Sequence, residues 1–488
     1  MYRPNPFPIL LLFLSVRVSA NPGIPKIAVV GAGLGGTSVS YFLQDIFGEG
    51  NVVVDVYEEH EIGGRLATVD IGDRSYEAGG SVIHPDNKYM AHFCKKFGLP
   101  KRPAGDPSSK FALYDGKDIV FEESDWEVVT WMKMLWRYGW SIIKLNNIVE
   151  KMLSEFRRIY LLQDRGSSYP SVEDLLRAMS PEFVNDVKVS SAQGFAKLGV
   201  SNRTIDEIVM AGLMVNYGQT TAAQKFVGSV SSAAGDGHLW SIAGGNKLIP
   251  EMLLKHSGAN FIKAKVKQIT LLQDSGNFNL SFISDGDDSP EHRSASDGIS
   301  ASVYETYDVV ILAAPLTSDT NQIAFKNFPS SFSIPGGKYH RTVCTFVKGE
   351  INAAYFGMKE KDVEILSIKN DLKINSISRV HDVRSLPKSD DQKVWKVFSQ
   401  KPLEDDDLKD LFSKIDETKV VDWLAYPHYN SYQKLGSFIL HDKLYHVNAI
   451  EWAASAMEMS VIGAKNVALL AHKDWTGGFI HSGMKDEL

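Results

Sequence analysis

Cysteine is scarce in this chain. Its 488 residues include only two, Cys94 and Cys344. Neither lies in a CxxC pair or close to other metal-ligating residues in the sequence, so we predict no zinc site and no other metal site. The two cysteines leave two states open: one disulfide, or two buried free thiols.

Basic charge is not in excess either. The formal net charge is −7 at pH 7, and the sequence pI is about 6.0. Because nucleic-acid binding needs a basic face, this balance gives no reason to expect a nucleic-acid partner.

The N-terminal apolar run is too short to cross a bilayer. Residues 9–16 read ILLLFLSV, and the small residues Val18-Ser19-Ala20 follow them, as a signal peptidase requires. We therefore expect residues 1–20 to be a cleaved secretory signal; an anchoring helix is the alternative. The chain ends in residues 485–488, KDEL, which a retrieval receptor of the ER binds. Both ends predict a protein of the secretory-pathway lumen, and two N-glycosylation sequons fit that location, at Asn202 and Asn279.

A glycine-rich loop follows the first predicted strand. Residues 26–30 form an apolar run typical of a buried strand, and a helical pattern extends from the loop to about Phe47. Between them Gly31, Gly33 and Gly36 form GxGxxG. The first glycine permits a tight turn, the second lets the backbone approach a pyrophosphate, and the third lets helix and strand pack closely. This context predicts a dinucleotide site at the helix N-terminus.

The segment after the second predicted strand (residues 51–57) favours FAD over NAD. Glu58 ends that strand and is placed to bind ribose hydroxyls. Gly63-Gly64-Arg65 then resembles the amine-oxidase class of flavoproteins, in which the arginine lies against the dinucleotide phosphates. Residues 76–81 (YEAGGS) resemble the segment that passes the flavin ring, which places Gly80 and Ser81 beside the ring. We expect non-covalent FAD.

Later stretches agree with this class. Val266, in FIKAKV, is positioned where such proteins hold the adenine with a strand backbone. Residues 240–248 (WSIAGGNKL) and 307–315 (YDVVILAAP) resemble further flavoprotein segments. Glu451 precedes a long helix expected over residues 453–470. We predict that Glu451 binds the cofactor and that the helix N-terminus stabilises negative charge on the flavin.

Length and these stretches define the expected fold. A chain of 488 residues is too long for one core. We expect an α/β protein with a Rossmann-type, amine-oxidase-like FAD domain and an inserted α+β substrate domain. The expected FAD domain comprises residues 24–90, 226–320 and 430–475; the substrate domain comprises 91–225, mostly helical, and 321–429; residues 476–488 form a tail.

Five stretches resemble one family in particular, the prenylcysteine oxidases, including the plant-type farnesylcysteine lyases. They are GGRLATV, YEAGGSVIHP, VNYGQ, WLAYPHY and AIEWAASAMEMS, at residues 63–69, 76–85, 215–219, 423–429 and 449–460. The resemblance implies FAD-dependent cleavage of S-farnesyl- or S-geranylgeranyl-L-cysteine, with O₂, to cysteine, a prenyl aldehyde and H₂O₂. It also implies a lysosomal or vacuolar location, which differs from the ER location that KDEL predicts.

Candidate substrate residues come from a tryptophan-rich segment and from two of these stretches. Residues 126–145 hold Trp126, Trp131, Trp136 and Trp140, four of the nine tryptophans. Their spacing spreads them around a helix, so we expect some to be exposed and to face a membrane surface or a lipid tunnel; core packing is the alternative. Tyr217 and His428 are expected to line the substrate pocket.

His84, just past the flavin-facing glycines, is the candidate catalytic residue. It could help to activate a water that attacks the substrate, or bind the amino-acid end of the substrate; a hydrogen-bonded core histidine is the alternative. Two other functions stay open: a flavin amine oxidase-like enzyme with another substrate, and a non-catalytic lumenal protein that binds lipid or a partner.

Overall fold

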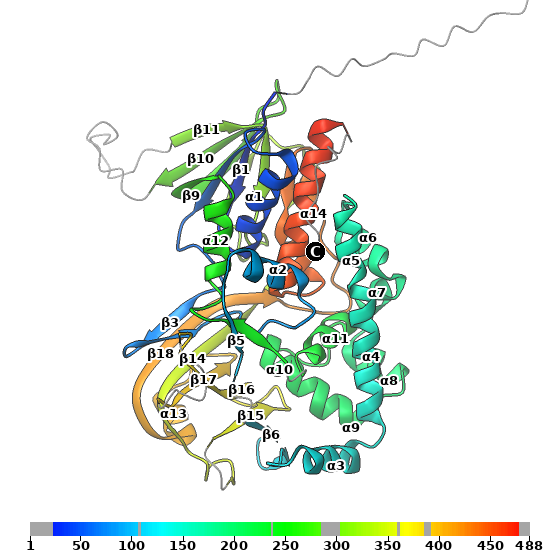
Figure 1. Ribbon diagram of the computed structural model, residues 1–488, viewed down its shortest axis with the longest axis vertical. Helices are drawn as coiled ribbons and strands as arrows, with labels where there is room; N and C mark the ends of the chain where they lie inside the picture. The colour runs from blue at the N-terminus through cyan, green and yellow to red at the C-terminus, as the bar shows by residue number, and fades with distance from the viewer. Residues whose placement is uncertain are drawn as a thin grey trace, which may run out of the picture.

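The computed structural model describes residues 23–105, 109–235, 238–284, 303–358, 362–384 and 392–477. The predicted signal peptide, the KDEL end and nearly all of the predicted tail lie outside these residues. Figure 1 shows two lobes, with the first strands and the last helix in the upper lobe and a second sheet in the lower lobe.

The upper lobe is built on a nine-stranded sheet. Strand β1 lies at its centre and pairs in parallel with β2 on one side and β12 on the other. Strand β1 is covered on both faces, and its four residues after Lys26 are all apolar and buried. The sheet contains β1 (Lys26–Val30), β2 (Val53–Glu58), β9 (Asn260–Leu271), β10 (Phe278–Ser284), β11 (Val303–Tyr307), β12 (Val309–Leu312), β13 (Ala324–Lys326), β19 (Ile439–His441) and β20 (Leu444–His446).

Helices cover one face of this sheet. Ile27 and Val29 of β1 point into a core shared with α1 (Leu34–Phe47), α12 (Leu248–His256) and α14 (Met457–Thr476), whereas Ala28 and Val30 belong to a core on the opposite face. The alternation follows from the two-residue period of a strand. It confirms the Rossmann-type unit predicted from residues 26–57. Among the described helices, none is both long and apolar enough to span a bilayer.

The lower lobe contains a seven-stranded sheet. Its first two strands in spatial order, β18 and β14, are 16 and 13 residues long and pair with each other along most of their length. In spatial order the sheet contains β18 (Phe412–Pro427), β14 (Tyr339–Ile351), β17 (Val394–Ser399), β16 (Ser376–Val380), β15 (Val363–Ser367), β6 (Lys110–Tyr114) and β7 (Ile119–Glu122).

Most of residues 91–225 are helical, as expected. The first part of this range instead forms strands that we did not predict, among them β6 and β7. Strand β6 pairs in parallel with β15, about 250 residues later in the chain. Such a partner leaves no local signal in the sequence. Strand β5 (Lys101–Pro103) was likewise missed, because it pairs with β8 (Trp240–Ile242).

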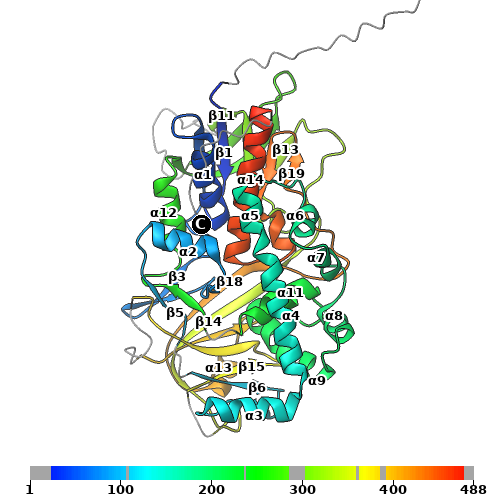
Figure 2. The same ribbon diagram turned by 45° about the vertical axis from the view of Figure 1, so that its right-hand side comes forward.

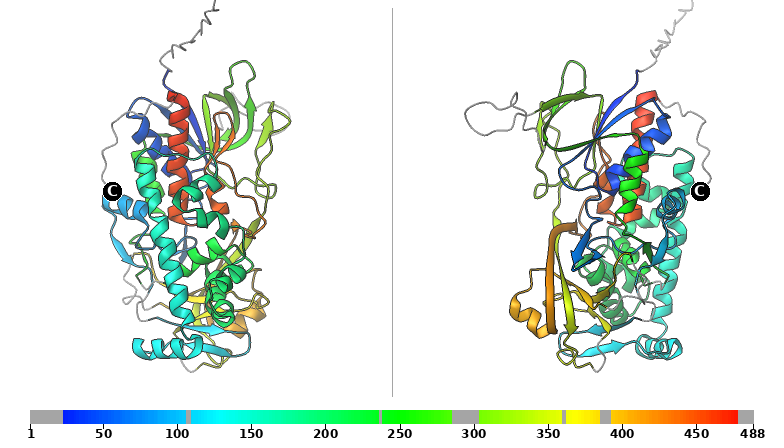
Figure 3. Two further views of the ribbon diagram at one scale, coloured as in Figure 1. Left: turned by 90° about the vertical axis from the view of Figure 1, so that its right-hand side faces the viewer. Right: turned by 60° about the vertical axis from the view of Figure 1, so that its left-hand side comes forward.

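A layer of helices packs beside the lower sheet (Figure 2). It begins at the lower end of the molecule with α3 and rises along α4 (Figure 3). The layer contains α3 (Glu127–Tyr138), α4 (Ser141–Phe156), α5 (Arg158–Asp164), α6 (Val172–Met179), α7 (Pro181–Asp186), α8 (Ser191–Lys197), α9 (Asn202–Thr204), α10 (Met210–Tyr217) and α11 (Lys225–Ala233).

The structure shifts two of the expected domain boundaries. Helix α11 packs on α4, α8 and α10, so it extends the helical layer past residue 225. Strand β13 pairs with β9 and so belongs to the upper sheet, although residues 321–429 were assigned to the substrate domain. Both shifts result from tertiary pairing that no local pattern records.

The two cysteines are free and buried. Cys94 lies in α2 (Lys88–Lys96), in the upper core, and Cys344 lies in β14 of the lower sheet. Burial raises the pKa of the Cys94 thiol to about 11 and that of Cys344 to about 12. Of the two states left open by the sequence, the structure shows the free thiols.

Candidate flavin site and substrate pocket

The GxGxxG loop connects β1 to α1, and its first and third glycines have no room for side chains. Gly31 has a φ of 107°, and a Cβ there would lie 2.8 Å from the carbonyl oxygen of Ala313. A Cβ on Gly36 would lie 1.8 Å from the carbonyl oxygen of Gly31. The helix can therefore pack against the strand turn only while both residues are glycine.

The N-terminus of α1 suits an anion. Gly33 is its N-cap and supplies no side-chain hydrogen bond, and the first turn contains no acidic residue. The amide groups of that turn and the positive end of the helix dipole can therefore serve a phosphate. Gly64 lies opposite, since a Cβ on it would lie 3.3 Å from Cα of Gly33. The two glycine turns thus form a narrow site that fits the pyrophosphate of a dinucleotide.

Glu58 and Val266 occupy the expected ends of neighbouring strands. The Glu58 carboxylate accepts hydrogen bonds from the amides of Ala32, at 2.7 Å, and His60, at 2.8 Å, which holds it beside the glycine loop. Strand β9 pairs with β2 up to Lys263 and with β13 from Gln268. Among the described strands, none pairs with that edge of β9 at Val266, so its backbone can bind an adenine there.

Arg65 and Glu451, both predicted to bind the cofactor, bind each other. Nη1 of Arg65 donates to Oε2 of Glu451 at 3.0 Å, and Nη2 contacts Oε1. Nη1 also donates to the carbonyl oxygen of Ala425 at 2.6 Å. The Glu451 side chain is 1% exposed and that of Arg65 is 31% exposed. Glu451 therefore neutralises Arg65 from inside, and only the arginine presents surface to the site.

Two consecutive glycines form the cradle expected for the flavin ring. A Cβ on Gly79 would lie 1.8 Å from the carbonyl oxygen of Arg65. A Cβ on Gly80 would lie 3.5 Å from Cγ of Met457, the first residue of α14. The N-cap of α14, Ala456, supplies no side-chain hydrogen bond. The side-chain-free backbone of the two glycines can approach a planar ring closely, and the first turn of α14 carries one acid, Glu458. Ser81 follows on the same segment, half-buried.

A buried lysine lies behind this cradle, and no sequence motif marked it. Nζ of Lys396, in β17, donates to the carbonyl oxygen of Glu77 at 3.0 Å, and burial lowers the pKa of Lys396. Burial raises the pKa of the Glu77 carboxyl to about 7, although it accepts a hydrogen bond from the amide of Asn246 at 2.6 Å. These polar groups fix the backbone just before the two glycines.

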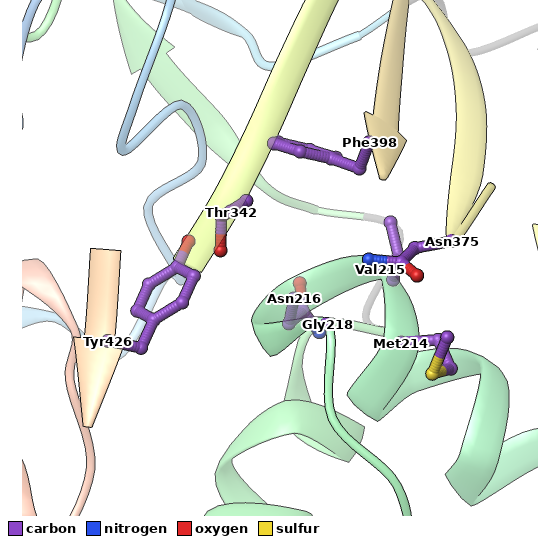
Figure 4. Close-up of a pocket in the computed structure, with 8 residues that line it drawn as sticks. All are labelled: Met214, Val215, Asn216, Gly218, Thr342, Asn375, Phe398 and Tyr426. Carbon is purple, nitrogen blue, oxygen red and sulfur yellow. The ribbon is translucent and has the colours of Figure 1, made fainter. Parts of the chain in front are cut away.

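A narrow gap, which we call the pocket, lies between α10 and the lower sheet. Its empty volume is about 160 Å³, and in this conformation it does not admit a water-sized sphere. Figure 4 shows the Tyr426 ring and Thr342 on one side and the α10 residues on the other. Its lining includes apolar and polar side chains: Met214, Val215, Asn216, Gly218, Thr342, Asn375, Phe398 and Tyr426.

Tyr217, a predicted pocket residue, lies directly beside this pocket. Its ring meets that of Tyr426 edge-on, with centroids 5.1 Å apart, and that of Tyr429 at 5.5 Å. The Tyr217 hydroxyl donates to the carbonyl oxygen of Ser455 at 3.1 Å, and the Ser455 amide donates to the Tyr429 hydroxyl at 2.7 Å. The tyrosines thus connect the pocket to the residues just before α14, where the flavin cradle lies.

His428 is exposed and lies at the rim of the same region. Its ring centroid is 6.1 Å from that of His340, a residue that sequence reasoning missed. His340 precedes Thr342 on β14 and faces Gly218. Burial, with a contribution from His428, lowers the pKa of His340 to about 4, so its imidazole is neutral at neutral pH.

His84 lies in the turn before α2. Its Nδ1 accepts a hydrogen bond from the amide of Asp86 at 3.1 Å. The ring is half-buried and helps to shape this turn. His84 is not among the residues that line the pocket beside Tyr426.

The tryptophans of residues 126–140 lie on the surface. Trp126, Trp131, Trp136 and Trp140 are 73%, 60%, 90% and 77% exposed. The expectation that some of them are exposed is confirmed, and core packing is not what the structure shows. None of them lines the pocket beside Tyr426.

The two sequons differ in access. Asn202 is exposed at the first residue of α9. Asn279 lies in β10 between two paired strands, and its side-chain oxygen is buried. Within the described residues, no group of three or more His, Cys, Asp or Glu side chains could hold a metal ion.

Comparison with known proteins defines the family. Residues 121–482 match the family model of prenylcysteine lyase, and residues 29–97 match that of an NAD(P)-binding Rossmann-like domain. The chain belongs to the prenylcysteine lyase family. The match includes the pocket and the start of α14, so it covers much more than the dinucleotide-binding unit.

Relatives of the prenylcysteine lyase family cover nearly the whole chain. Prenylcysteine oxidase 1 from Mus musculus is 39% identical over 484 residues, which cover 96% of this chain and 93% of that protein. Prenylcysteine oxidase 1-like from Homo sapiens is 35% identical over 491 residues, 97% of this chain and 96% of that protein.

Solved structures confirm the fold class. A putrescine oxidase bound to putrescine superposes with a TM-score of 0.55 at 13% identity, covering 91% of this chain and 98% of that one. Cyclohexylamine oxidase from Brevibacterium oxydans superposes with a TM-score of 0.56 at 13% identity, covering 92% and 99%. At this identity the likeness shows only the fold.

Proposed function

We propose that the chain is an FAD-dependent thioether oxidase. It cleaves S-farnesyl- or S-geranylgeranyl-L-cysteine to cysteine, a prenyl aldehyde and H₂O₂ during the breakdown of prenylated proteins. The observation that carries this proposal is the family match over residues 121–482, which includes the pocket, Val266 and Glu451. The glycine loop and Glu58 lie in the separate Rossmann-like match over residues 29–97. A generic dinucleotide-binding protein would share only the glycine loop.

The residues present fit FAD. The glycine turns at Gly33 and Gly64 receive the pyrophosphate, Glu58 receives a ribose, and the free edge of β9 at Val266 receives the adenine. When bound, FAD supplies the two-electron acceptor for the carbon next to sulfur and passes the electrons to O₂. Cys344 packs in the same apolar cluster as Ala78, directly before the cradle glycines, but burial raises the pKa of its thiol to about 12. Non-covalent binding therefore stays part of the proposal.

The pocket residues position the substrate. The gap must open to admit a prenyl chain, and Met214, Val215 and Phe398 would then supply its apolar contacts. The edge of the pocket near Tyr217 and Tyr426 presents aromatic faces to a carbon that becomes cationic between sulfur and the alkene. Water must then attack this carbon, and a neutral histidine can accept the proton that the water loses.

His340 is better placed than His84 for that proton. It faces Gly218 of the pocket and is neutral at neutral pH, whereas His84 lies in the turn before α2. His428, 6.1 Å away between ring centroids, is exposed and can pass the proton toward solvent.

Location and partners complete the proposal. The signal peptide of residues 1–20 would deliver the chain to the secretory lumen, and KDEL would engage a retrieval receptor, which favours the ER over lysosome or vacuole. Because the substrate carries a lipid, a peripheral contact with a membrane belongs to the same proposal.

The test is the stoichiometry of the reaction. Purified mature protein is first examined for flavin absorbance and then mixed with S-farnesyl-L-cysteine in air, while H₂O₂ and farnesal are measured together. Equal amounts of both products support the proposal; a primary amine in place of the thioether is the control. Peroxide from the amine alone would indicate an amine oxidase, and a protein without flavin would indicate a non-catalytic binding protein.

A further inference from the structure

Helix α3 carries apolar side chains on the side that faces solvent. Val128, Met132 and Trp136 are 71%, 58% and 90% exposed, and they are spaced four residues apart. Tyr138 is instead buried against the protein, where its hydroxyl donates to Glu207. An ordinary surface helix has the opposite arrangement, with its apolar stripe toward the core. The outer face of α3 therefore has an apolar surface with nothing in the described chain covering it.

Tryptophans before, within and after the helix enlarge this surface. Trp126 is the N-cap of α3, Trp131 lies within it, and Trp140 follows it as the N-cap of α4. All three are mostly exposed. We call the exposed apolar side chains of residues 126–143 the tryptophan surface: Trp126, Val128, Trp131, Met132, Leu135, Trp136, Trp140 and Ile143. A surface this rich in large apolar side chains indicates an interaction site.

The position of α3 suits a flat partner. The helix lies across the lower end of the molecule, away from the lobe that holds the glycine loop, and the four views agree on this (Figures 1, 2 and 3). A helix that lies across the tip can contact a plane along its whole length. The hollow beside the helix, about 450 Å³ and lined by Lys133, Trp136 and residues 118–122, is open to solvent rather than enclosed.

The charges of the segment complement phosphate groups. Residues 126–145 contain Lys133, Arg137 and Lys144 against one acid, Glu127. Arg137 is already paired with Glu207, so Lys133 and Lys144 are the cations of this segment that can meet phosphate groups. Lys133 and Lys144 are exposed. Indole rings and lysines beside an apolar stripe are typical of helices that lie in the headgroup region of a bilayer.

We infer that α3 is a docking helix that lies in the plane of a phospholipid membrane, with the tryptophan surface in the headgroup region. The inference deepens the proposed function, because a prenylated substrate partitions into such a membrane. An apolar cluster connects the two sites: Tyr138 of α3 packs with Phe121 and with Ala211 of α10. Met214 and Val215, on the next turn of α10, line the substrate pocket. The docked helix thus places the lower lobe, and the pocket within it, at the membrane.

The test is binding of the flavin-loaded protein to phosphatidylcholine vesicles, with and without phosphatidylserine, measured by flotation. The variant is the double substitution Trp131→Glu with Trp136→Glu. The matched control is Leu161→Glu, which places the same charge on an exposed leucine of α5, 55% exposed. Melting temperatures show that each variant folds. We expect wild type and the control to bind the vesicles, and the tryptophan emission of wild type to shift to the blue on binding. The double variant should bind the vesicles at least about ten-fold more weakly.

Two results of the flotation assay would overturn the inference: no vesicle binding by wild type, or equal binding by wild type and the double variant. The inference would also fail if wild type were a dimer in solution and the double variant a monomer, because the tryptophan surface would then be a contact between two copies. A second variant, Lys133→Glu with Lys144→Glu, should weaken binding to phosphatidylserine vesicles more than to phosphatidylcholine alone. Wild type that binds vesicles through these tryptophans but releases no peroxide from soluble S-farnesyl-L-cysteine would support docking and reject the proposed reaction, so the two failures are distinguishable.

Discussion

Replacing Glu451 with glutamine tests the role of the buried ion pair. The carboxylate accepts hydrogen bonds from Arg65, from the Tyr339 hydroxyl at 3.0 Å and from Asn448 at 2.6 Å. Glutamine has nearly the same shape but no charge, so Glu451→Gln leaves the Arg65 guanidinium without its counter-charge. Removing one partner of a buried pair costs roughly 3–5 kcal/mol. Because Arg65 keeps some contact with water, we expect the lower value, about 3 kcal/mol.

The assay is thermal unfolding of the flavin-loaded protein. For a domain of about 150–250 residues, a loss of about 3 kcal/mol in the free energy of unfolding corresponds to a fall in Tm of roughly 6–12 °C. The matched control is Asp422→Asn, which breaks a pair with Arg341 whose side chains are 35% and 49% exposed. An exposed pair contributes only about 0.2–1 kcal/mol, so the control should lose no more than about 4 °C.

Two results bear on the reasoning. Equal Tm values for Glu451→Gln and Asp422→Asn would refute it, because the buried pair would then be no more important than an exposed one. The double variant Arg65→Met with Glu451→Gln removes both charges, and we expect it to recover part of the lost stability. A double variant less stable than Glu451→Gln would show that Arg65 contributes through contacts other than this pair.

Three further predictions follow from the site. Gly79→Ala should abolish flavin retention, measured by absorbance after gel filtration, because its Cβ would strike a carbonyl oxygen at 1.8 Å; Gly336→Ala, where nothing lies within 4 Å, is the control. His340 has a folded pKa of about 4, below its usual 6.5, so protonation of the unfolded state lowers stability as pH falls from about 6.5 to 4; His340→Gln should lose less Tm over that interval than wild type. Mass spectrometry of secreted or lumenal protein should find a glycan on Asn202 and not on Asn279, whose side-chain oxygen is buried; full occupancy at Asn279 would contradict this.

The cofactor-binding unit was predictable because its signals are local. GxGxxG with a strand before it and a helix after it requires only about twenty adjacent residues, and the structure gives β1 and α1 almost at the expected bounds. The glycines of the flavin cradle were equally visible. The role of Arg65 was only half predictable: the arginine stands out in the motif, but its partner Glu451 lies 386 residues later.

The substrate lobe was less predictable because its contacts are distant. His340, Lys396 and Thr342 occupy ordinary strand positions, and they acquire a role only when β14 and β17 pair beneath the glycine cradle. Strand β6 was hidden for the same reason. The tryptophans of residues 126–140 were easy to notice in the sequence because four lie so close together. Only the structure shows that they lie on the solvent-facing surface.

The buried thiols have a consequence for an enzyme that generates an oxidant. Peroxide attacks the thiolate form of cysteine, and with a pKa of about 11 for Cys94 and about 12 for Cys344, fewer than about one thiol in a thousand is ionised at neutral pH. Cys344 lies on β14, the strand that also carries His340. Placing that thiol in an apolar core lets the protein release its own product through many turnovers without oxidising itself.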